Sequence, residues 1–517
     1  FHLTNDGVWF WDVKVNGANV EVDVIYGQDI SIASKGAVRN NEAYVAQYID
    51  HTIFESTEKG YVVCSRQNQP QPGGFPYLQQ GSLTKATGYL TDGFQFFGLP
   101  YKETDVPEVL FQESLPNEVY QYEFAYTALQ SEKVNLAGET QFVFYGLFKE
   151  NHEEAITELA FEDEVQRAWE TVQGTKLDLG VEQQKVRTSD KIGAPVQTTT
   201  LTMDEINKYF PNRLQEEWEG DTLLSFFTDT HEHVVLKEKE LIVERPHGHI
   251  IMTGQNDKMK ENMFSSTSYM YGIFNSQVVV GNTSFNKMLS NARNALNIFK
   301  TSGQRIYVEV EGTYQLLTMP SMYEIGFNYA RWYYKTATDM IIITNYTMVD
   351  TPELQLHVQS ESGTQYRFLV TNQVVVNANE LETPFVMEEE NGVVTFTAHE
   401  TSMSANVYPE LTYKWRVDGA EMKITNEQAL VENAAAHSAA LVVLELEHTS
   451  DWTMTIQGLL YGEEVPFAEK NEADEIAKYR DFLRDCMNGF ELSQNGVETT
   501  ELEKVNSLAW WYTHNML

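Results

Sequence analysis

The 517-residue sequence has few cysteines, few cations relative to anions, and no long apolar run. Its two cysteines, Cys64 and Cys486, lie far apart, so a disulfide framework is not expected and a reducing compartment is favoured. No stretch reaches the roughly 18 apolar residues of a membrane-spanning helix, and the first residues show no basic segment followed by an apolar one. The sequence therefore predicts a cytoplasmic protein.

Positive charge is also scarce. There are 36 Lys and Arg against 75 Asp and Glu, which gives a formal net charge of −39. A field of this sign repels nucleic-acid phosphates and anionic lipid. Nucleic acid and membrane surfaces are therefore not expected partners.

Familiar catalytic signatures are missing as well. The sequence contains no Gly-rich phosphate loop, no nucleophile elbow and no Cys-x-x-Cys pair. Two His-x-His pairs, His231 with His233 and His247 with His249, place histidines on one face of a strand, as some metal sites do. No carboxylate or cysteine at ligand spacing reinforces them, so ordinary polar strand faces are the favoured interpretation. We expect no metal site and no cofactor.

The sequence is rich in residues that favour β-strands. Short runs rich in Val, Tyr and Phe, parted by Gly, Pro, Asn and Asp, fill residues 1–150 and again 221–465. Much of residues 151–220 has apolar residues at helical spacing. Gly174 should end one helix there, and Pro211 should interrupt or bound a second. A further helix is expected near 286–299. The pattern predicts a mainly β chain with helical insertions, in which both strand-rich stretches form one large antiparallel β-sandwich region.

The last fifty residues change to helical periodicity. Residues 466–498 predict a linker helix with Ile476, Tyr479, Leu483 and Met487 on one side. Within 499–517, Thr500 and Glu503 have the spacing of a capping box, and apolar residues then recur at three- and four-residue steps. No Gly, Pro or basic last turn precedes Leu517, so we expect a helix that is cut before its natural end.

The densest polar stretch is residues 36–54. Arg39, Asn41, Glu42, Gln47 and Asp50 stand there among aromatic and aliphatic positions. Amides, guanidinium groups and carboxylates suit sugar hydroxyls, which both donate and accept hydrogen bonds. Glu42 and Asp50 could form the acid and base of a glycosidase, but a polar strand-and-turn edge is the favoured interpretation, since sequence spacing says nothing about carboxylate separation.

Four long motifs in the same order carry a family resemblance: GAVRNNEAYVAQYIDHTIF, GYVVCSRQNQPQPGGFPYLQQGSL, TDGFQFFGL and LAWWYTHNML. With them the chain resembles, from near its first residue to its last, the N-terminal half of the β-1,2-oligoglucan phosphorylases of glycoside hydrolase family 94. The resemblance implies an inverting phosphorylase, in which inorganic phosphate is the co-substrate, an aspartic acid protonates the leaving oxygen, and α-glucose 1-phosphate is released.

The resemblance also implies an architecture: a large β-sandwich region, a linker helix and an (α/α)6 barrel that holds the catalytic acid and the phosphate site. Residues 499–517 would be the first barrel helix, so we expect no catalytic residue in this chain and a barrel supplied in cis or by a second chain. In family homodimers a sandwich loop closes over the partner's sugar site. The candidates for such contacts with a β-1,2-glucooligosaccharide are Arg39, Asn41, Glu42, Gln47, Asp50, Arg66 and Gln67.

Two alternatives stay open at this point. The chain could be a free-standing β-glucan-binding module, for which sandwich strands and aromatic residues suffice. It could also be the phosphorylase-like part of a cyclic β-1,2-glucan synthase, or of a cellodextrin phosphorylase.

Overall fold

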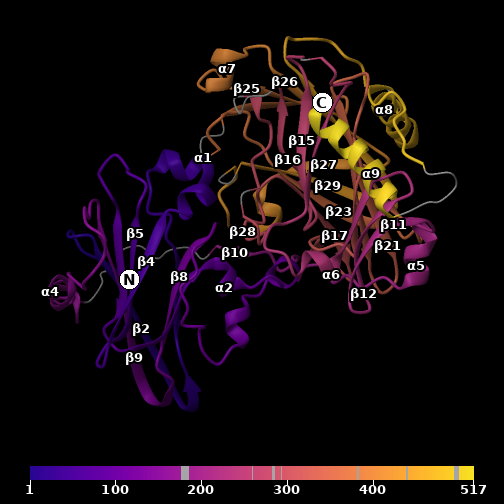
Figure 1. The fold of residues 1–517 in the computed structure, drawn as a ribbon. Coiled ribbons are helices and arrows are strands. Elements are labelled where there is room, and N and C mark those ends of the chain that lie inside the picture. Colours follow the sequence, from indigo (N-terminus) through magenta and orange to yellow (C-terminus); the bar gives the residue numbers. More distant parts are fainter. Residues whose placement is uncertain are drawn as a thin grey trace. The chain divides into compact units, whose positions relative to one another are not determined.

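The computed structural model describes residues 1–175, 186–258, 260–281, 286–292, 294–380, 384–437, 440–467, 469–493 and 500–517 (Figure 1). The chain forms two units. Unit 1 is Phe1–Tyr101 with Asp105–Gln183, and unit 2 is Lys102–Thr104 with Gln184–Leu517. Strands dominate both, which confirms the prediction of a mainly β chain.

Unit 1 is built on a nine-stranded sheet with the order β1-β2-β9-β6-β5-β7-β8-β3, while β4 pairs with β5. All pairings are antiparallel except a single contact of Gly60 with Ala86 between β5 and β7. The elements are β1 His2–Leu3, β2 Val8–Val22, β3 Ile25–Asp29, α1 Lys35–Ala46, β4 Ile49–Ser56, β5 Gly60–Gln67, β6 Tyr77–Ser82, β7 Ala86–Asp92, α2 Gly93–Phe97, α3 Tyr101–Thr104, η1 Glu108–Phe111, β8 Ala125–Ser131, β9 Val134–Lys149 and α4 Glu162–Val172.

Both faces of this sheet are covered by apolar clusters. Successive side chains of a strand point to opposite sides, so one strand contributes to both clusters. On β9, Val143 and Tyr145 join one core cluster, whereas Phe142 and Phe144 join another. Helix α4 covers the first cluster with Val165 and Ala168. Gly174 follows the end of α4 with φ 74°, so the helix ends where the sequence predicts.

Unit 2 contains two large antiparallel sheets. The eleven-stranded sheet has the order β11-β12-β13-β19-β20-β21-β22-β30-β26-β25-β24, and the eight-stranded one β14-β15-β16-β17-β23-β29-β27, with β18 beside β17. The elements are β10 Arg187–Thr188, α5 Met203–Tyr209, β11 Arg213–Glu219, β12 Thr222–Thr228, β13 His233–Leu236, α6 Lys237–Glu240, β14 Gly248–Met252, β15 Phe264–Tyr269, β16 Ile273–Val280, β17 Gln304–Val310, β18 Thr313–Leu316, β19 Met322–Ile325, β20 Tyr329–Lys335, β21 Met340–Thr347, β22 Glu353–Ser360, β23 Tyr366–Gln373, β24 Phe385–Glu390, β25 Val393–Ala398, α7 Met403–Val407, β26 Thr412–Asp418, β27 Met422–Thr425, η3 Glu427–Ala429, β28 Val431–Glu432, β29 Leu441–Thr449, β30 Asp451–Leu459, α8 Glu472–Cys486 and α9 Thr500–Met516.

The two sheets of unit 2 enclose one apolar core. Trp332 and Ile343 enter it from the eleven-stranded sheet, and Val370 and Leu444 enter it from the eight-stranded sheet. This is the face-to-face arrangement of a β-sandwich. The outer face of the larger sheet is covered in part by α5, whose Ile206 packs with Phe226 and its neighbours.

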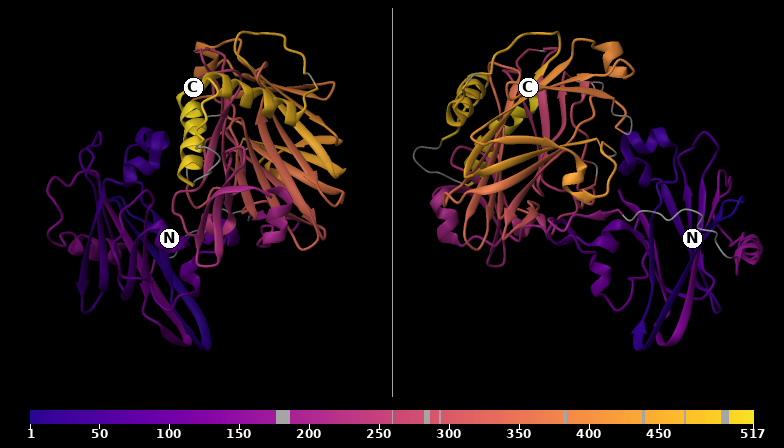
Figure 2. Two further views of the ribbon diagram at one scale, coloured as in Figure 1. Left: turned by 45° about the vertical axis from the view of Figure 1, so that its right-hand side comes forward. Right: turned by 180° about the vertical axis from the view of Figure 1, so that it is seen from behind.

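The two C-terminal helices lie side by side against unit 2, where Figure 2 shows them in yellow. Helix α8 contacts β21 and α9, and α9 contacts β11. Tyr479 and Leu483 on α8 are buried, and Asn488 and Gly489 follow the helix with positive φ. A helix therefore forms over Glu472–Cys486, within the residues where the sequence predicts one.

Several local predictions are wrong. Residues 36–46, expected as a strand-and-turn edge, form helix α1 because Val45 and Ala46 dock on the sheet beside Ile49. The second helical segment ends at Tyr209, and Arg213–Glu219 is the strand β11, since a turn at Gly220 and Asp221 pairs it with β12.

Two larger expectations also change. Residues 286–292 and 294–299 are not helical, because Lys287 and Leu289 bridge to β16 and to Val374 as irregular chain. The nine-stranded sheet of unit 1 shares no strand with the sheets of unit 2, so the two stretches of strands form separate β structures rather than one extended sandwich.

Candidate functional site

The polar stretch singled out in the sequence lies on α1 and β4 of unit 1. Helix α1 is interrupted at Asn41, whose backbone adopts the extended values φ −160° and ψ 92°. The Asn41 side-chain oxygen accepts a hydrogen bond from the backbone N–H of Tyr44 at 3.1 Å, so it caps the second half of the helix. The Asn41 side chain therefore stabilises the helix locally. Asn41 is also exposed to solvent.

Glu42 reaches the segment that follows β3. The hydroxyl group of Ser31 lies between two carboxylates: it contacts Glu42 Oε1, and Asp29 Oδ1 is 3.3 Å away. A serine hydroxyl carries one proton and cannot donate to both at once. Desolvation, together with the nearby charge of Glu42, raises the pKa of Asp29 to about 6. The Asp29 carboxyl group can therefore take up a proton near pH 6.

Beside this pair is a cavity of about 400 Å³, which we call the unit 1 cavity. Trp9 forms part of its wall, and its indole N–H donates to the Tyr26 hydroxyl at 3.2 Å. A cavity of this size with an aromatic wall and a few polar groups is typical of small-molecule sites. The residues that matter here are Trp9, Gln28, Asp29 and Ser31. Sequence reasoning missed all four, although Trp9 stands in the aromatic run GVWFWDV.

Arg39 and Gln47 lie at different places on α1. The Arg39 Nε atom is buried and has no hydrogen-bond partner among the described residues. Gln47 ends the helix, and its side-chain amide lies 3.4 Å from Glu123 Oε1. Neither belongs to the unit 1 cavity.

The remaining three candidates lie on β4 and β5. Asp50 and Arg66 are cross-strand partners and both contact the side chain of Asn68. Arg66 Nε donates to the His152 carbonyl at 2.8 Å, and Gln67, fully buried, donates to the Val45 carbonyl at 3.0 Å. Arg66 and Gln67 thus hold backbone, whereas Asp50 is exposed. The structure does not bring the seven candidates into one cluster.

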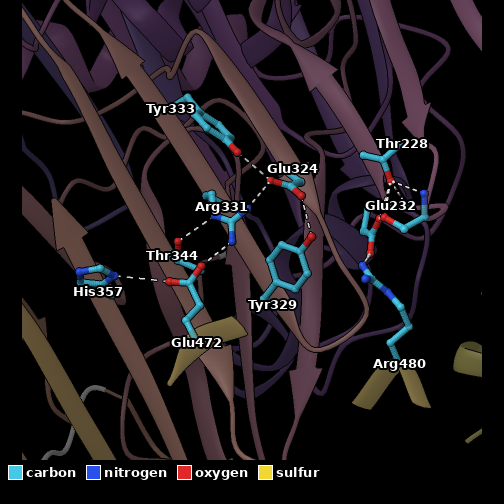
Figure 3. A network of polar contacts seen from close by, with 11 residues as sticks. Thr228, Glu232, Glu324, Tyr329, Arg331, Tyr333, Thr344, His357, Glu472 and Arg480 are labelled. Atoms are coloured by element: carbon cyan, nitrogen blue, oxygen red, sulfur yellow. Dashed lines mark hydrogen bonds and ion pairs between the residues drawn. The ribbon is translucent and has the colours of Figure 1, made fainter. Parts of the chain in front are cut away.

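Unit 2 has its own polar network, which anchors α8 (Figure 3). Arg331 on β20 donates to Glu324 at 2.8 Å and to Glu472 in the first turn of α8. Tyr329 and Tyr333 also donate to Glu324, at 2.6 and 2.9 Å. Both Glu324 oxygens and the Arg331 guanidinium group therefore have partners, as a buried polar network requires. This arrangement fixes a helix and presents no open reacting group.

The four histidines of the His-x-His pairs do not form one cluster, although the His233 and His247 rings lie 6.2 Å apart. His231 contacts the Ser507 hydroxyl at 2.9 Å, and His247 contacts Glu240 at 2.6 Å. His233 stacks on Phe227, and His249 lies against Trp511 and His514 of α9. Within the described ranges, no group of three or more His, Cys, Asp or Glu side chains is placed to hold a metal ion. Nor does any helix of those ranges have the length and apolar character to cross a membrane.

Helix α9 has two different faces. Trp510 and Trp511 pack with Phe327, and the Trp511 indole donates to the His231 carbonyl at 2.9 Å. On the other side four apolar side chains at three- and four-residue steps are exposed by 40 to 83%: Val505, Leu508, Tyr512 and Met516. The stripe seen in the sequence is thus divided between the core of unit 2 and an uncovered face.

Comparison with known proteins first identifies the class. Residues 1–146 match the family described as the SOGP N-terminal domain, and residues 210–458 match the glycoside phosphorylase supersandwich domain. The chain is thus similar to these two domain families, and the larger match covers the sandwich of unit 2.

The particular relative is a 1,2-beta-oligoglucan phosphorylase of Listeria innocua serovar 6a, which is 39% identical over 515 residues and 98% of this chain. This finding confirms the resemblance to the β-1,2-oligoglucan phosphorylases. The chain spans about half of that relative, 45% of its length.

Two solved structures were also found. A putative kojibiose phosphorylase from the human microbiome aligns with 58% of this chain and 33% of its own, at 9% identity and a TM-score of 0.21. The 4-alpha-glucanotransferase of Thermococcus litoralis aligns with 42% of this chain and 40% of its own, at 10% identity and a TM-score of 0.23. Scores this low support no argument about fold or function.

Proposed function

We propose that this chain is the non-catalytic β portion of an inverting glycoside phosphorylase, which converts β-1,2-linked glucooligosaccharides and inorganic phosphate to α-glucose 1-phosphate. The observation that carries the proposal is the similarity to a 1,2-beta-oligoglucan phosphorylase over 98% of this chain but only 45% of that protein. We expect a protein that shares 39% of its residues with the relative over this length to serve the same reaction.

The chemistry itself needs groups that we do not assign to this chain. A general acid must lie within hydrogen-bond reach of the leaving oxygen, and phosphate needs fixed donors or cations beside it. We propose that the part of the relative beyond the matched length supplies both, as an (α/α)6 barrel in cis or on a second chain. The exposed face of α9 supports this, because Leu508, Tyr512 and Met516 would be covered by packing against further helices.

Unit 1 would contribute to sugar binding. The exposed Asp50 and the unpaired Nε of Arg39 are the best of the predicted contacts, and the unit 1 cavity adds Trp9 and Asp29. Arg66 and Gln67 are the weakest, because their donors already hold backbone carbonyls. A homodimer in which unit 1 faces the partner's sugar site remains part of the proposal.

Other expectations stay proposals too. No cofactor other than the co-substrate phosphate is needed for this reaction. Cys64 is buried and Cys486 is exposed, and both are free thiols, which suits the reducing cytoplasm.

The alternative is a free-standing β-glucan-binding module, which the unit 1 cavity would favour. The experiment incubates linear β-1,2-glucooligosaccharide and phosphate with the 517-residue chain, with a complete phosphorylase that contains it, and with no protein. Glucose 1-phosphate from the complete protein alone is the expected result. Release by the isolated chain would show an active site within it, and no release by the complete protein would contradict the proposed reaction.

A further inference from the structure

Unit 2 contains a larger cavity that the network of Figure 3 does not use. It has a volume of about 710 Å³ and lies between the β14–β15 connection, the end of β16 and the chain that follows β30. We call it the unit 2 cavity. The residues on which the argument depends are Lys258, Lys260, Glu261, Asn286 and Tyr461.

One buried group in this wall lacks a partner. Asn286 is 1% exposed, and its side-chain N–H₂ donates to the Val280 carbonyl at 2.7 Å. That bond fixes the orientation of the amide, and the opposite atom, Oδ1, is buried without a hydrogen-bond partner. An unsatisfied buried carbonyl oxygen is destabilising, so a donor from a bound molecule would be favoured there.

Two donors on the same wall are also unused. Neither Lys258 nor Lys260 forms an ion pair or a hydrogen bond with another residue in the part of the chain that the structure describes. Together with Asn286 Oδ1, they offer donors and an acceptor around one space. A hydroxyl group, which both donates and accepts, matches such a set.

The cavity also has a flat apolar surface. The Tyr461 side chain is 50% exposed, and its hydroxyl contacts Glu261 Oε2, which holds the ring in place. A fixed aromatic ring with polar groups at its rim suits the apolar face of a sugar ring. Asn286 Oδ1 can only accept a hydrogen bond, and an ionised phosphate oxygen has no proton to donate to it, so the ring and the amide together favour a hydroxyl-bearing neutral ligand over a phosphate.

We propose that the unit 2 cavity is a carbohydrate-binding site that takes a neutral glucosyl unit of an oligosaccharide. The ring stacks on Tyr461, one hydroxyl donates to Asn286 Oδ1, and the lysines donate to others. The choice of glucose rests on the proposed function. The existence of a sugar site rests on the cavity alone.

The test is calorimetric titration of the 517-residue chain with linear β-1,2-glucooligosaccharide. We expect saturable binding that Tyr461→Ala weakens roughly tenfold, which corresponds to about 1.4 kcal/mol. Tyr461→Phe keeps the ring and should retain most of the affinity. Lys258→Ala should weaken binding, whereas Lys423→Ala, which changes an exposed lysine on β27, should leave it unchanged. Each changed side chain is exposed enough that folding should not depend on it.

Three results would overturn the proposal: no saturable binding, equal binding by Tyr461→Ala and the unsubstituted chain, or tighter binding of inorganic phosphate than of the oligosaccharide. Phosphorolysis by the complete phosphorylase is measured separately. Phosphorolysis without binding at the unit 2 cavity defeats this inference alone, and binding without phosphorolysis defeats the proposed function alone.

Discussion

Glu232, in the turn between β12 and β13, accepts a hydrogen bond from the guanidinium group of Arg480 on α8, 248 positions later in the chain. Glu232 is 1% exposed, so its charge depends on this partner and on the Thr228 hydroxyl. The start of α8 is held in a similar way, by Arg331 on Glu472. Two charged contacts, one in the first turn and one near the middle of the helix, therefore fix α8 on the sheet (Figure 3).

Arg480→Ala should destabilise the chain by about 3–5 kcal/mol, because it leaves the Glu232 carboxylate buried and unpaired. Urea unfolding followed by far-UV circular dichroism measures the change. The matched control is Arg484→Ala, one turn further along α8, whose pair with Asp481 is exposed and should be worth less than about 1 kcal/mol. Equal effects of the two substitutions would show that the buried charge is not the cause.

Acid should weaken the attachment of α9. Burial lowers the pKa of His249 to about 3 and that of His514 to about 4, and the two rings face each other 5.8 Å apart. The unfolded chain binds these protons first, so stability is complete above the ordinary histidine pKa and falls as the pH drops from about 6.5 toward 4. The slope is about 1.4 kcal/mol per pH unit for each proton.

The fluorescence of Trp510 and Trp511 reports this transition, because both rings pack between α9 and Phe327. His514→Gln should make the loss of stability between pH 6.5 and 4 shallower. An unchanged slope in His514→Gln would contradict the assignment to this histidine.

Much of the fold could be predicted from the sequence because its signals are local. The alternation of Val, Tyr and Phe gives the strands, Gly174 and Gly489 end helices, and the stripe on 472–486 gives α8. The predicted secondary structure was wrong where tertiary contacts determine whether a segment is a helix or a strand. Residues 36–46 are polar, and only the docking of Val45 and Ala46 on the sheet makes them a helix. Residues 213–219 are rich in Glu, yet pairing with β12 makes them a strand.

The candidate site was predicted less well than the fold. Arg66 and Gln67 looked equivalent to Asp50 as polar groups, but hydrogen bonds to carbonyls 86 and 22 positions away, respectively, occupy them. The sequence could not show that Ser31 joins Asp29 to Glu42, or that Asn286 keeps an unpaired oxygen beside a cavity. Such groups come from separate elements, and no spacing rule brings them together.

In a complete phosphorylase, Arg39→Ala or Asp50→Ala should raise KM for the oligosaccharide and leave kcat nearly unchanged. A group that only holds the sugar binds ground state and transition state alike, and losing it removes uniform binding. Steady-state kinetics with varied oligosaccharide measures the two constants. A lower kcat at unchanged KM would instead place these residues in the chemistry.

Arg66→Ala is the comparison for these variants. Its guanidinium group holds the carbonyls of His152 and Glu153 and lies over the Phe75 ring at 4.3 Å. We therefore expect a loss of stability of about 1–3 kcal/mol, measured by urea unfolding, rather than a specific effect on KM. A raised KM with unchanged stability would return Arg66 to the sugar-binding candidates.

The exposed face of α9 should make the isolated chain self-associate. Leu508 and Tyr512 are 52 and 65% exposed on the same face as Met516, and burying apolar surface is worth about 25 cal/mol per Å². The double substitution Leu508→Ser and Tyr512→Ser should reduce association in sedimentation velocity runs without changing the urea midpoint, because neither side chain is part of the core. The control is Leu110→Ser, which changes an apolar residue of unit 1 that is 61% exposed and should leave association unchanged.

In a complete phosphorylase the same double substitution should lower stability instead, since there the face would pack against the rest of the protein. Association that persists in the double variant would show that another surface is responsible, and unchanged stability of the complete protein would show that this face of α9 stays uncovered.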